Sequence, residues 1–222
     1  MGTNGKSGGV WDRKDCALLL IDYQDNILGM VFEQDRRVVE LNARTLAEAA
    51  INLEIPVVLS TVGVEMGLNG PVIESLQAVL PGVQAIDRHT TNAWEDSAFV
   101  AAVKRTGRKR LVMGGIVTSV CLTYPAVSAL ADGYEVAFIE DAVADMYKEM
   151  HDTAVLRLAH AGAVPNTAKA MLTEWFRDLQ SPAADAVAGV YEAYFGEIAP
   201  LKETPEYQDP IGVMERAGGQ SA

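Results

Sequence analysis

The sequence predicts an α/β fold with three layers, in which helices cover both faces of a mostly parallel sheet of about six strands. Short apolar runs alternate with longer segments of helical spacing along the chain, and this alternation is typical of parallel sheets. The apolar runs are continuous, as expected for strands buried on both faces. Several helical segments stop at a glycine, which commonly ends a helix.

The elements follow in chain order. Strands are predicted at 16–24, 55–62, within 84–94, 109–117, 134–145 and 163–168, and helices at 35–52, within 67–82, at 95–107, 119–132, 148–162 and 168–179. The helix at 95–107 starts with acidic and ends with basic residues, which suits its dipole. Pro125 lies in the first turns of the helix at 119–132 and predicts a distorted start there.

The length of 222 residues fits one domain. We expect a flexible tail at 1–12, the domain at 13–180 and a C-terminal extension at 181–222. The tail contains "GTNGKSGG", which looks like a phosphate loop, but no strand precedes it and no helix follows it. The uncharged segment 111–131 is long enough to span a bilayer. Its glycines, its hydroxyl residues and Pro125 favour a strand, a turn and a helix instead.

The charge of the chain limits its partners. The formal net charge is -12, which repels phosphate backbones and anionic lipid. We therefore expect no nucleic-acid or membrane partner. There are two cysteines and no apolar N-terminal leader, so a reducing cytoplasm is the predicted compartment, with a single disulfide as the alternative.

The C-terminal extension carries an apolar stripe at near-helical spacing. It consists of Val187, Val190, Tyr191, Tyr194, Phe195 and Ile198. If helices of the domain already cover both faces of the sheet, the stripe needs another surface, either within the chain or on a partner. The prediction is a homo-oligomer larger than a dimer, with this extension at the contacts.

Four polar or reactive residues fall near strand ends: Asp22, Arg88, Cys121 and Asp141. Sites in parallel sheets form at the carboxyl ends of strands. Cys121 is either a buried core residue or a nucleophile. Its place near a helix N-terminus favours the nucleophile, since the dipole lowers a thiol pKa and the N–H groups can hold an oxyanion. Cys16, at the start of a strand, is predicted to be structural.

The other polar residues leave alternatives open. Asp22 is a general base, a helix cap or a surface group, with Asp25 as a second acid nearby, and Arg88 is a site residue or a surface charge paired with Asp87 or Asp96. Among the histidines, His151 and His160 are predicted on a surface helix, and His89 is a candidate partner of Cys121. No Cys or His cluster with the spacing of a metal site is present.

Several blocks carry a family resemblance: "ALLLIDYQDNIL", "GLNGPVIESLQAVLPG", "TTNAWEDSAFVAAVK", "LVMGGIVTSVCLTYPAVSALADGYEVAFIEDA" and "MLTEWFRD". In these blocks, over about residues 14–180, the chain resembles the isochorismatase-like cysteine hydrolases, most closely the YcaC-like branch. The resemblance implies an Asp–basic–Cys triad at Asp22, Arg88 and Cys121. Many members have lysine at the basic position, and arginine cannot shuttle a proton.

The resemblance also implies a cis peptide between Ile116 and Val117, and oxyanion donors at the N–H groups of Val117 and Cys121. Nicotinamidases of this superfamily often hold a metal through Asp and His residues. This chain lacks those histidines, so we expect neither a metal nor another cofactor. The residues assigned to the substrate pocket are Gln24, Asn92, Trp94 and Thr118.

The predicted function is a cysteine-dependent hydrolase that cleaves a C–N bond of a small amide through a thioester. An ether substrate of isochorismate type stays open. The alternative function is an inert, oligomeric binding or interaction protein, which the arginine at position 88 motivates. A dinucleotide-binding domain is disfavoured, because "DYQDNIL" stands where G-x-G-x-x-G would follow the first strand.

Overall fold

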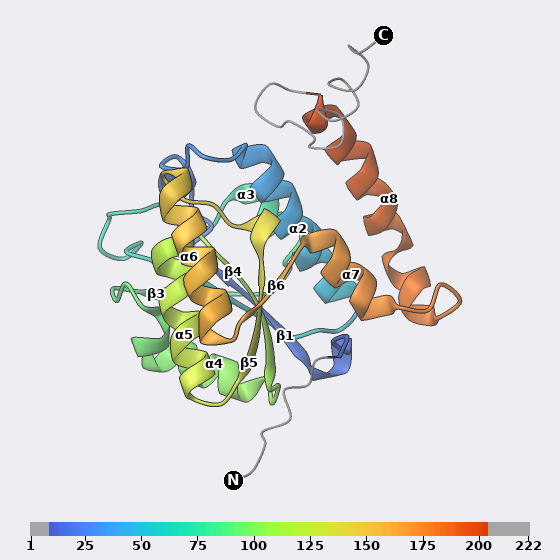
Figure 1. Ribbon diagram of the computed structural model, residues 1–222, viewed down its shortest axis with the longest axis horizontal. Helices are drawn as coiled ribbons and strands as arrows, with labels where there is room; N and C mark the ends of the chain where they lie inside the picture. The colour runs from blue at the N-terminus through green and yellow to red at the C-terminus, as the bar shows by residue number, and fades with distance from the viewer. Residues whose placement is uncertain (1–8, 204–222) are drawn as a thin grey trace.

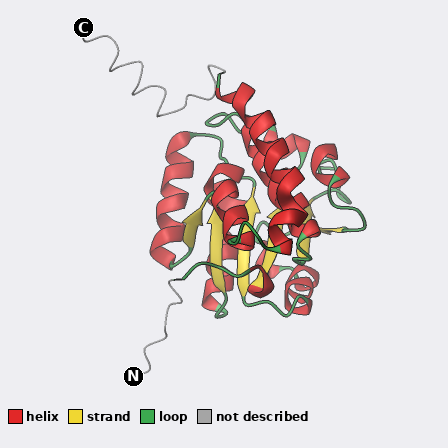
Figure 2. Cartoon of the chain, turned by 90° about the vertical axis from the view of Figure 1, so that its right-hand side faces the viewer, coloured by secondary structure: helices red, strands yellow, loops and turns green. Residues whose placement is uncertain are grey.

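A computed structural model describes residues 9–203 and confirms the predicted fold class. Six strands form one sheet in the order β3-β2-β1-β4-β5-β6, and all neighbouring strands are parallel (Figure 2). The strands are β1 (Cys16–Ile21), β2 (Val57–Val62), β3 (Ala85–Arg88), β4 (Arg110–Gly115), β5 (Glu135–Ile139) and β6 (Val164–Asn166).

Helices cover both faces of the sheet (Figure 1). One face carries α2 (Arg36–Asn52), α3 (Glu74–Ala78) and α7 (Ala168–Phe176), with α8 (Pro182–Lys202) outside them, and the other carries α4 (Ser97–Arg105), α5 (Thr123–Ala131) and α6 (Lys148–Ala161). Shorter elements are α1 (Asp25–Leu28), η1 (Arg13–Asp15), η2 (Ala93–Glu95), η3 (Thr118–Leu122) and η4 (Glu140–Ala142).

The helix ends follow from local side-chain chemistry. Asp35 caps α2 by accepting from the Arg37 N–H, and Asp96 caps α4 by accepting from the Phe99 N–H. Gly162 ends α6 in the left-handed conformation, with φ of 102°, which glycine adopts without steric cost. The ends of these helices are therefore set by two capping carboxylates and by one glycine in the left-handed conformation.

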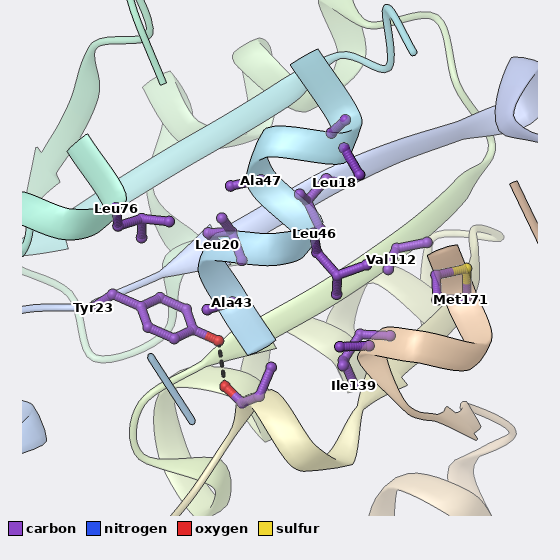
Figure 3. Close-up of a cluster of buried hydrophobic side chains, with 14 of the residues drawn as sticks. Leu18, Leu20, Tyr23, Ala43, Leu46, Ala47, Leu76, Val112, Ile139 and Met171 are labelled. Carbon is purple, nitrogen blue, oxygen red and sulfur yellow. Dashed lines mark hydrogen bonds between the residues drawn. The ribbon is translucent and has the colours of Figure 1, made fainter. Parts of the chain in front are cut away.

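Strand β1 shows why its sequence is apolar at every position. Leu18 and Leu20 pack in the cluster that contains Leu46 of α2 and Met171 of α7 (Figure 3). The alternate residues pack on the other face of the sheet: Ala17, Leu19 and Ile21. Successive side chains of a strand point to opposite faces, so a strand in the middle of three layers must be apolar throughout.

The strand order changes direction at β1. The chain leaves β1 toward β2 and β3, and then returns to form β4 on the other side of β1. Loops that follow β1 and β4 therefore leave the sheet in different directions, and ligands of open α/β sheets bind at such a point. Asp22 follows β1, and the η3 turn follows β4.

Two features of the chain ends bear on the predicted boundaries. Trp11, which was assigned to the tail, is buried, and its backbone N–H donates to Glu174 Oε2 at 2.8 Å. The C-terminal stripe finds its surface within the chain, because α2 has a second apolar face on which α8 packs (Figure 1). Its buried members are Val187, Val190, Tyr194 and Ile198. Phe195 stays 43% exposed.

No membrane-spanning helix is found in the described part of the chain, residues 9–203. The uncharged stretch 111–131 forms β4, η3 and α5, as predicted. The segment "GTNGKSGG", up to residue 8, and the C-terminal "EYQDPIGVMERA" lie outside the described residues.

Candidate active site

Asp22 lies directly after β1 and is fully buried. Its φ is 62°, in the left-handed region that Asp tolerates better than most residues. The Asp22 N–H donates to the Ser60 carbonyl at 3.0 Å, which fixes the turn. Neither a surface role nor a helix cap fits this place. Asp25, the second acid, is exposed and pairs with Arg36.

Arg88 ends β3, two strands away from β1, and its side chain crosses β2 to reach Asp22. Nη2 donates to Asp22 Oδ2, and Nη1 donates to the Thr90 carbonyl. The residue is 3% exposed, so the alternative of a surface charge paired with Asp87 or Asp96 is wrong. Asp96 caps α4 instead.

Cys121 sits in the η3 turn between β4 and α5. The glycine pair before it is required by close packing. A Cβ at Gly114 would collide with the Tyr23 hydroxyl, and one at Gly115 would lie 3.1 Å from the Leu122 nitrogen. The Ile116–Val117 peptide is cis, as the resemblance implies.

The predicted distortion of this helix start is present. Residues 118–122 form a π-type turn before regular α5 begins. Pro125 has no N–H to donate to the carbonyl four residues earlier, which belongs to Cys121. Cys121 lies in this irregular turn and therefore outside the regular helix α5.

The electrostatics of the site couple Cys121 to Asp22. Burial raises the pKa of Asp22 to about 6, against the Arg88 charge and a hydrogen bond from Cys121, which lower it. Burial also raises the pKa of Cys121, and the Asp22 charge raises it further, while Arg88 opposes this. The resting pair at neutral pH is thus a thiol beside a carboxylate.

The expected lowering of the thiol pKa by the helix N-terminus is therefore wrong. Burial and the adjacent carboxylate dominate, so the thiol needs a base to take its proton. Asp22 is the carboxylate that interacts with it.

Two buried polar atoms of the site have no hydrogen-bond partner among the described residues: Asp22 Oδ1 and Arg88 Nε. Both belong to the same ion pair, next to Cys121. Five other buried polar atoms in residues 9–203 also lack a partner, so it is the buried ion pair that marks the site.

The two predicted oxyanion donors differ. The Cys121 N–H donates to the Val117 carbonyl at 2.9 Å. For the Val117 N–H, no acceptor is recorded in the described part of the chain. Val117 is thus the free donor beside the thiol turn.

The residues assigned to the substrate pocket all have structural partners. Gln24 joins Val62 and Gly70 through its amide, with Nε2 2.6 Å from the Gly70 carbonyl. Asn92 accepts from the Trp94 N–H and lies 3.2 Å from Ser128 Oγ. These two amides shape the loops around the site and do not present a free polar group to a substrate.

Trp94 points away from the site. Its indole N–H donates to Asp132 Oδ2 at 2.8 Å, and its ring contacts Tyr134. Asp132 follows the C-terminal end of α5, whereas Cys121 precedes its start. Thr118, also assigned to the pocket, is fully buried and contacts His151.

Asp141 and the three histidines lie outside the Asp22–Arg88–Cys121 site. Asp141 does not join the site: its Oδ1 accepts from the Ala168 N–H at the start of α7, and burial raises its pKa to about 6. His89 and His160 are exposed, so a Cys121–His89 pair does not form. His151 is 5% exposed, and its assignment to a surface position is wrong.

The sequence does carry a signal for the burial of His151. His151, Ala154 and Leu158 are spaced by three and four residues and form the buried face of α6. Within residues 9–203, no group of three or more His, Cys, Asp or Glu side chains is arranged to hold a metal ion.

Comparison with known proteins gives a consistent result. Residues 16–170 match the model of the isochorismatase domain family. The chain is 36% identical over 168 residues to the probable hydrolase YcaC of Escherichia coli (strain K12), which covers 75% of this chain and 80% of that protein.

Solved structures agree with the family match. A YcaC structure from Pseudomonas aeruginosa, with hexane-2,5-diol and covalent acrylamide, superposes with a TM-score of 0.78 at 31% identity, covering 88% of this chain and 98% of that one. The Escherichia coli YcaC crystal structure, described as an octameric hydrolase of unknown specificity, superposes with a TM-score of 0.77 at 31% identity over 86% of this chain and 96% of that one.

Proposed function

The chain belongs to the isochorismatase family of hydrolases, and from this premise we propose that Cys121 is its nucleophile and a small amide its substrate. Asp22 serves as the general base and acid. Arg88 holds Asp22 in place and keeps it ionised. The reaction is hydrolysis of a C–N bond through a thioester.

The first half of the reaction forms the thioester. Cys121 Sγ attacks the carbonyl carbon while Asp22 takes the thiol proton, and the carbonyl electrons move to oxygen. The Val117 N–H, for which residues 9–203 provide no acceptor, stabilises this oxyanion. When the C–N bond breaks, Asp22 returns its proton to the nitrogen, and the amine or ammonia leaves.

The second half releases the acid. Asp22, ionised again, takes a proton from water, and the resulting hydroxide attacks the thioester carbonyl. The C–S bond then breaks, and the proton on Asp22 restores the Cys121 thiol. Arg88 transfers no proton in either half, since arginine stays charged at accessible pH. This explains how arginine suffices at a position where many members have lysine.

One observation carries the proposal: the ion pair of Asp22, after β1, and Arg88, at the end of β3, is fully buried beside Cys121 in the turn that follows β4. Desolvating such an ion pair is expensive, and here its carboxylate interacts with a thiol whose proton it can accept. The acrylamide bound covalently in the Pseudomonas aeruginosa structure gives further support, because acrylamide is both a small amide and a thiol reagent.

The direct test compares wild type with Cys121→Ala in a screen of small metabolites that contain amides and vinyl ethers. Hydrolysis by the wild type that is absent in Cys121→Ala supports the proposal. Turnover that survives in Cys121→Ala overturns it. Cleavage of ethers alone, dependent on Cys121, replaces the amide by an ether of isochorismate type. If no compound is hydrolysed and Cys121 does not react with thiol reagents, the inert binding protein is favoured.

We also propose that the protein works as a homo-oligomer larger than a dimer in a reducing cytoplasm, where Cys16 and Cys121 stay free. The Escherichia coli relative is described as octameric, and Phe195 on α8 is exposed next to Tyr191 and Tyr194. Light scattering on the full chain tests this, with Phe195→Glu as the interface variant. A full-length monomer at micromolar concentration contradicts it.

A further inference from the structure

A second buried polar cluster lies behind the turn that carries Cys121. His151 Nδ1 is 3.0 Å from Thr118 Oγ1 and 3.5 Å from Glu33 Oε1. Thr118 is the first residue of η3, His151 lies in the first turn of α6, and Glu33 lies between α1 and α2. All three side chains are buried, and none of them takes part in the proposed chemistry.

The same turn is held from a fourth segment, which follows η4. The Thr118 N–H donates to the Ala144 carbonyl at 2.9 Å, and the Ser119 N–H donates to Asp145 Oδ2 at 2.7 Å. The Asp145 N–H in turn donates to Glu33 Oε1 at 3.2 Å. Glu33 Oε1 thus accepts from the loop and also lies 3.5 Å from His151 Nδ1, so Glu33 contacts both segments.

This cluster costs free energy to build. Burial raises the pKa of Glu33, although His151 opposes this, and a buried imidazole also loses its hydration. Apolar side chains would fill the same space more cheaply. Buried polar networks fix one arrangement of the groups they join. The arrangement fixed here is that of Thr118, the neighbour of Val117 and three residues before Cys121.

We propose that His151, oriented by Glu33, is a positioning residue that holds Thr118 and thereby aims the Val117 N–H and the Cys121 thiol at the reacting carbonyl. The inference rests on the proposed function of Cys121. His151 itself touches neither the thiol nor the Asp22–Arg88 pair. It acts through the Thr118 hydroxyl and the backbone of the turn.

The variants follow from the geometry. Thr118→Val removes the hydroxyl at nearly constant volume. His151→Leu removes the hydrogen bond, whereas His151→Asn keeps an amide near the place of Nδ1. His160→Leu changes an exposed histidine of the same helix and serves as the matched control. Thermal unfolding of the full-length protein shows which variants are folded.

The readout is the alkylation rate of Cys121 by iodoacetamide at pH 7.5, followed by peptide mass spectrometry in the full-length protein. Cys16 in the same molecules is the internal control. Thr118→Val and His151→Leu should slow alkylation of Cys121 about tenfold or more, since a small misplacement of reacting groups can cost about 10²-fold. His151→Asn should restore the rate to within about threefold of wild type, and His160→Leu should leave it unchanged.

The outcomes separate this inference from the proposed function. If Cys121 in wild type reacts no faster than Cys16, the proposed nucleophile fails and the positioning role fails with it. If wild-type Cys121 is reactive and Thr118→Val is equally reactive, only the positioning role is overturned. The positioning role is also overturned if Cys121 is alkylated as slowly in His151→Asn as in His151→Leu. In that case the hydrogen bond to Thr118 does not position the turn. Should His151→Leu fail to fold, Thr118→Val decides the question alone.

Discussion

The two cysteines lie near opposite ends of the central strands and look alike at first. Both are buried and free, and burial is the largest cause that raises the pKa of each, to about 12 for Cys16. Their neighbours differ. Cys16 Sγ donates to the Asp12 carbonyl at 3.2 Å, whereas Cys121 interacts with the Asp22 carboxylate, which Arg88 holds.

The difference teaches that neither burial nor a raised pKa tells a nucleophile from a core cysteine. A backbone carbonyl can accept a hydrogen bond from a thiol but cannot keep its proton. A carboxylate whose own pKa is raised to about 6 can take the proton in the transition state and return it later. Proximity to such a base is what sets Cys121 apart.

The largest expected difference between the two cysteines is the loss of turnover when each is replaced by alanine. Cys121→Ala should lower turnover by about 10³-fold or more, because the covalent route is lost. Cys16→Ala should keep nearly all turnover. Both variants should lose only about 1 kcal/mol of unfolding free energy, as expected for a small cavity. Turnover on a substrate found by screening, together with urea unfolding, measures both quantities, and equal losses of turnover would break the comparison.

Removing the base comes next. Asp22→Asn should lower turnover by about 10²- to 10⁴-fold, the usual contribution of general acid–base catalysis. In wild type, activity should fall as pH drops through about 6, since protonated Asp22 cannot accept the thiol proton. A pH–rate profile shows this limb. An Asp22→Asn enzyme that keeps the wild-type rate would remove the base from the mechanism.

The smallest expected effect concerns the charge at position 88. Arg88 lowers the pKa of Asp22, so Arg88→Ala should move the acidic limb above pH 6. Arg88→Lys keeps a positive charge and should lose about tenfold in rate, because one ammonium cannot reproduce the two guanidinium hydrogen bonds. The limb is read from pH–rate profiles of the folded variants. An identical limb in all three proteins would show that Arg88 does not tune Asp22.

The fold was readable because its signals are local. Continuous apolar runs such as residues 16–21, bounded by polar residues, indicated buried strands, and the glycine at 162 indicated the end of a helix. The triad positions came mainly from the family resemblance. That Arg88 crosses β2 to meet Asp22 depends on the strand order, which no local pattern specifies.

Other features were missed because they depend on packing between distant segments. The second apolar face of α2, with Val38 and Leu41, covers Tyr194 and Ile198 of the C-terminal stripe. This contact depends on where α8 packs, which no local pattern specifies. The raised pKa of Cys121 depends on burial next to Asp22, and a helix N-terminus alone suggested the opposite direction. Trp94 was assigned to the substrate pocket because it lies in a block that resembles the family. In the structure, its indole N–H donates to Asp132 at the far end of α5.

One measurement tests the central claim most directly: the alkylation rates of Cys121 and Cys16 in the same native protein, followed by peptide mass spectrometry from pH 5 to about 9, a window that brackets the Asp22 pKa. The account predicts that Cys121 reacts faster than Cys16 at neutral pH, that its rate rises through a limb near pH 6 as Asp22 ionises, and that Asp22→Asn abolishes this limb. Equal rates for the two cysteines, or a Cys121 rate that climbs only above pH 8 like that of an isolated thiol, would contradict the account.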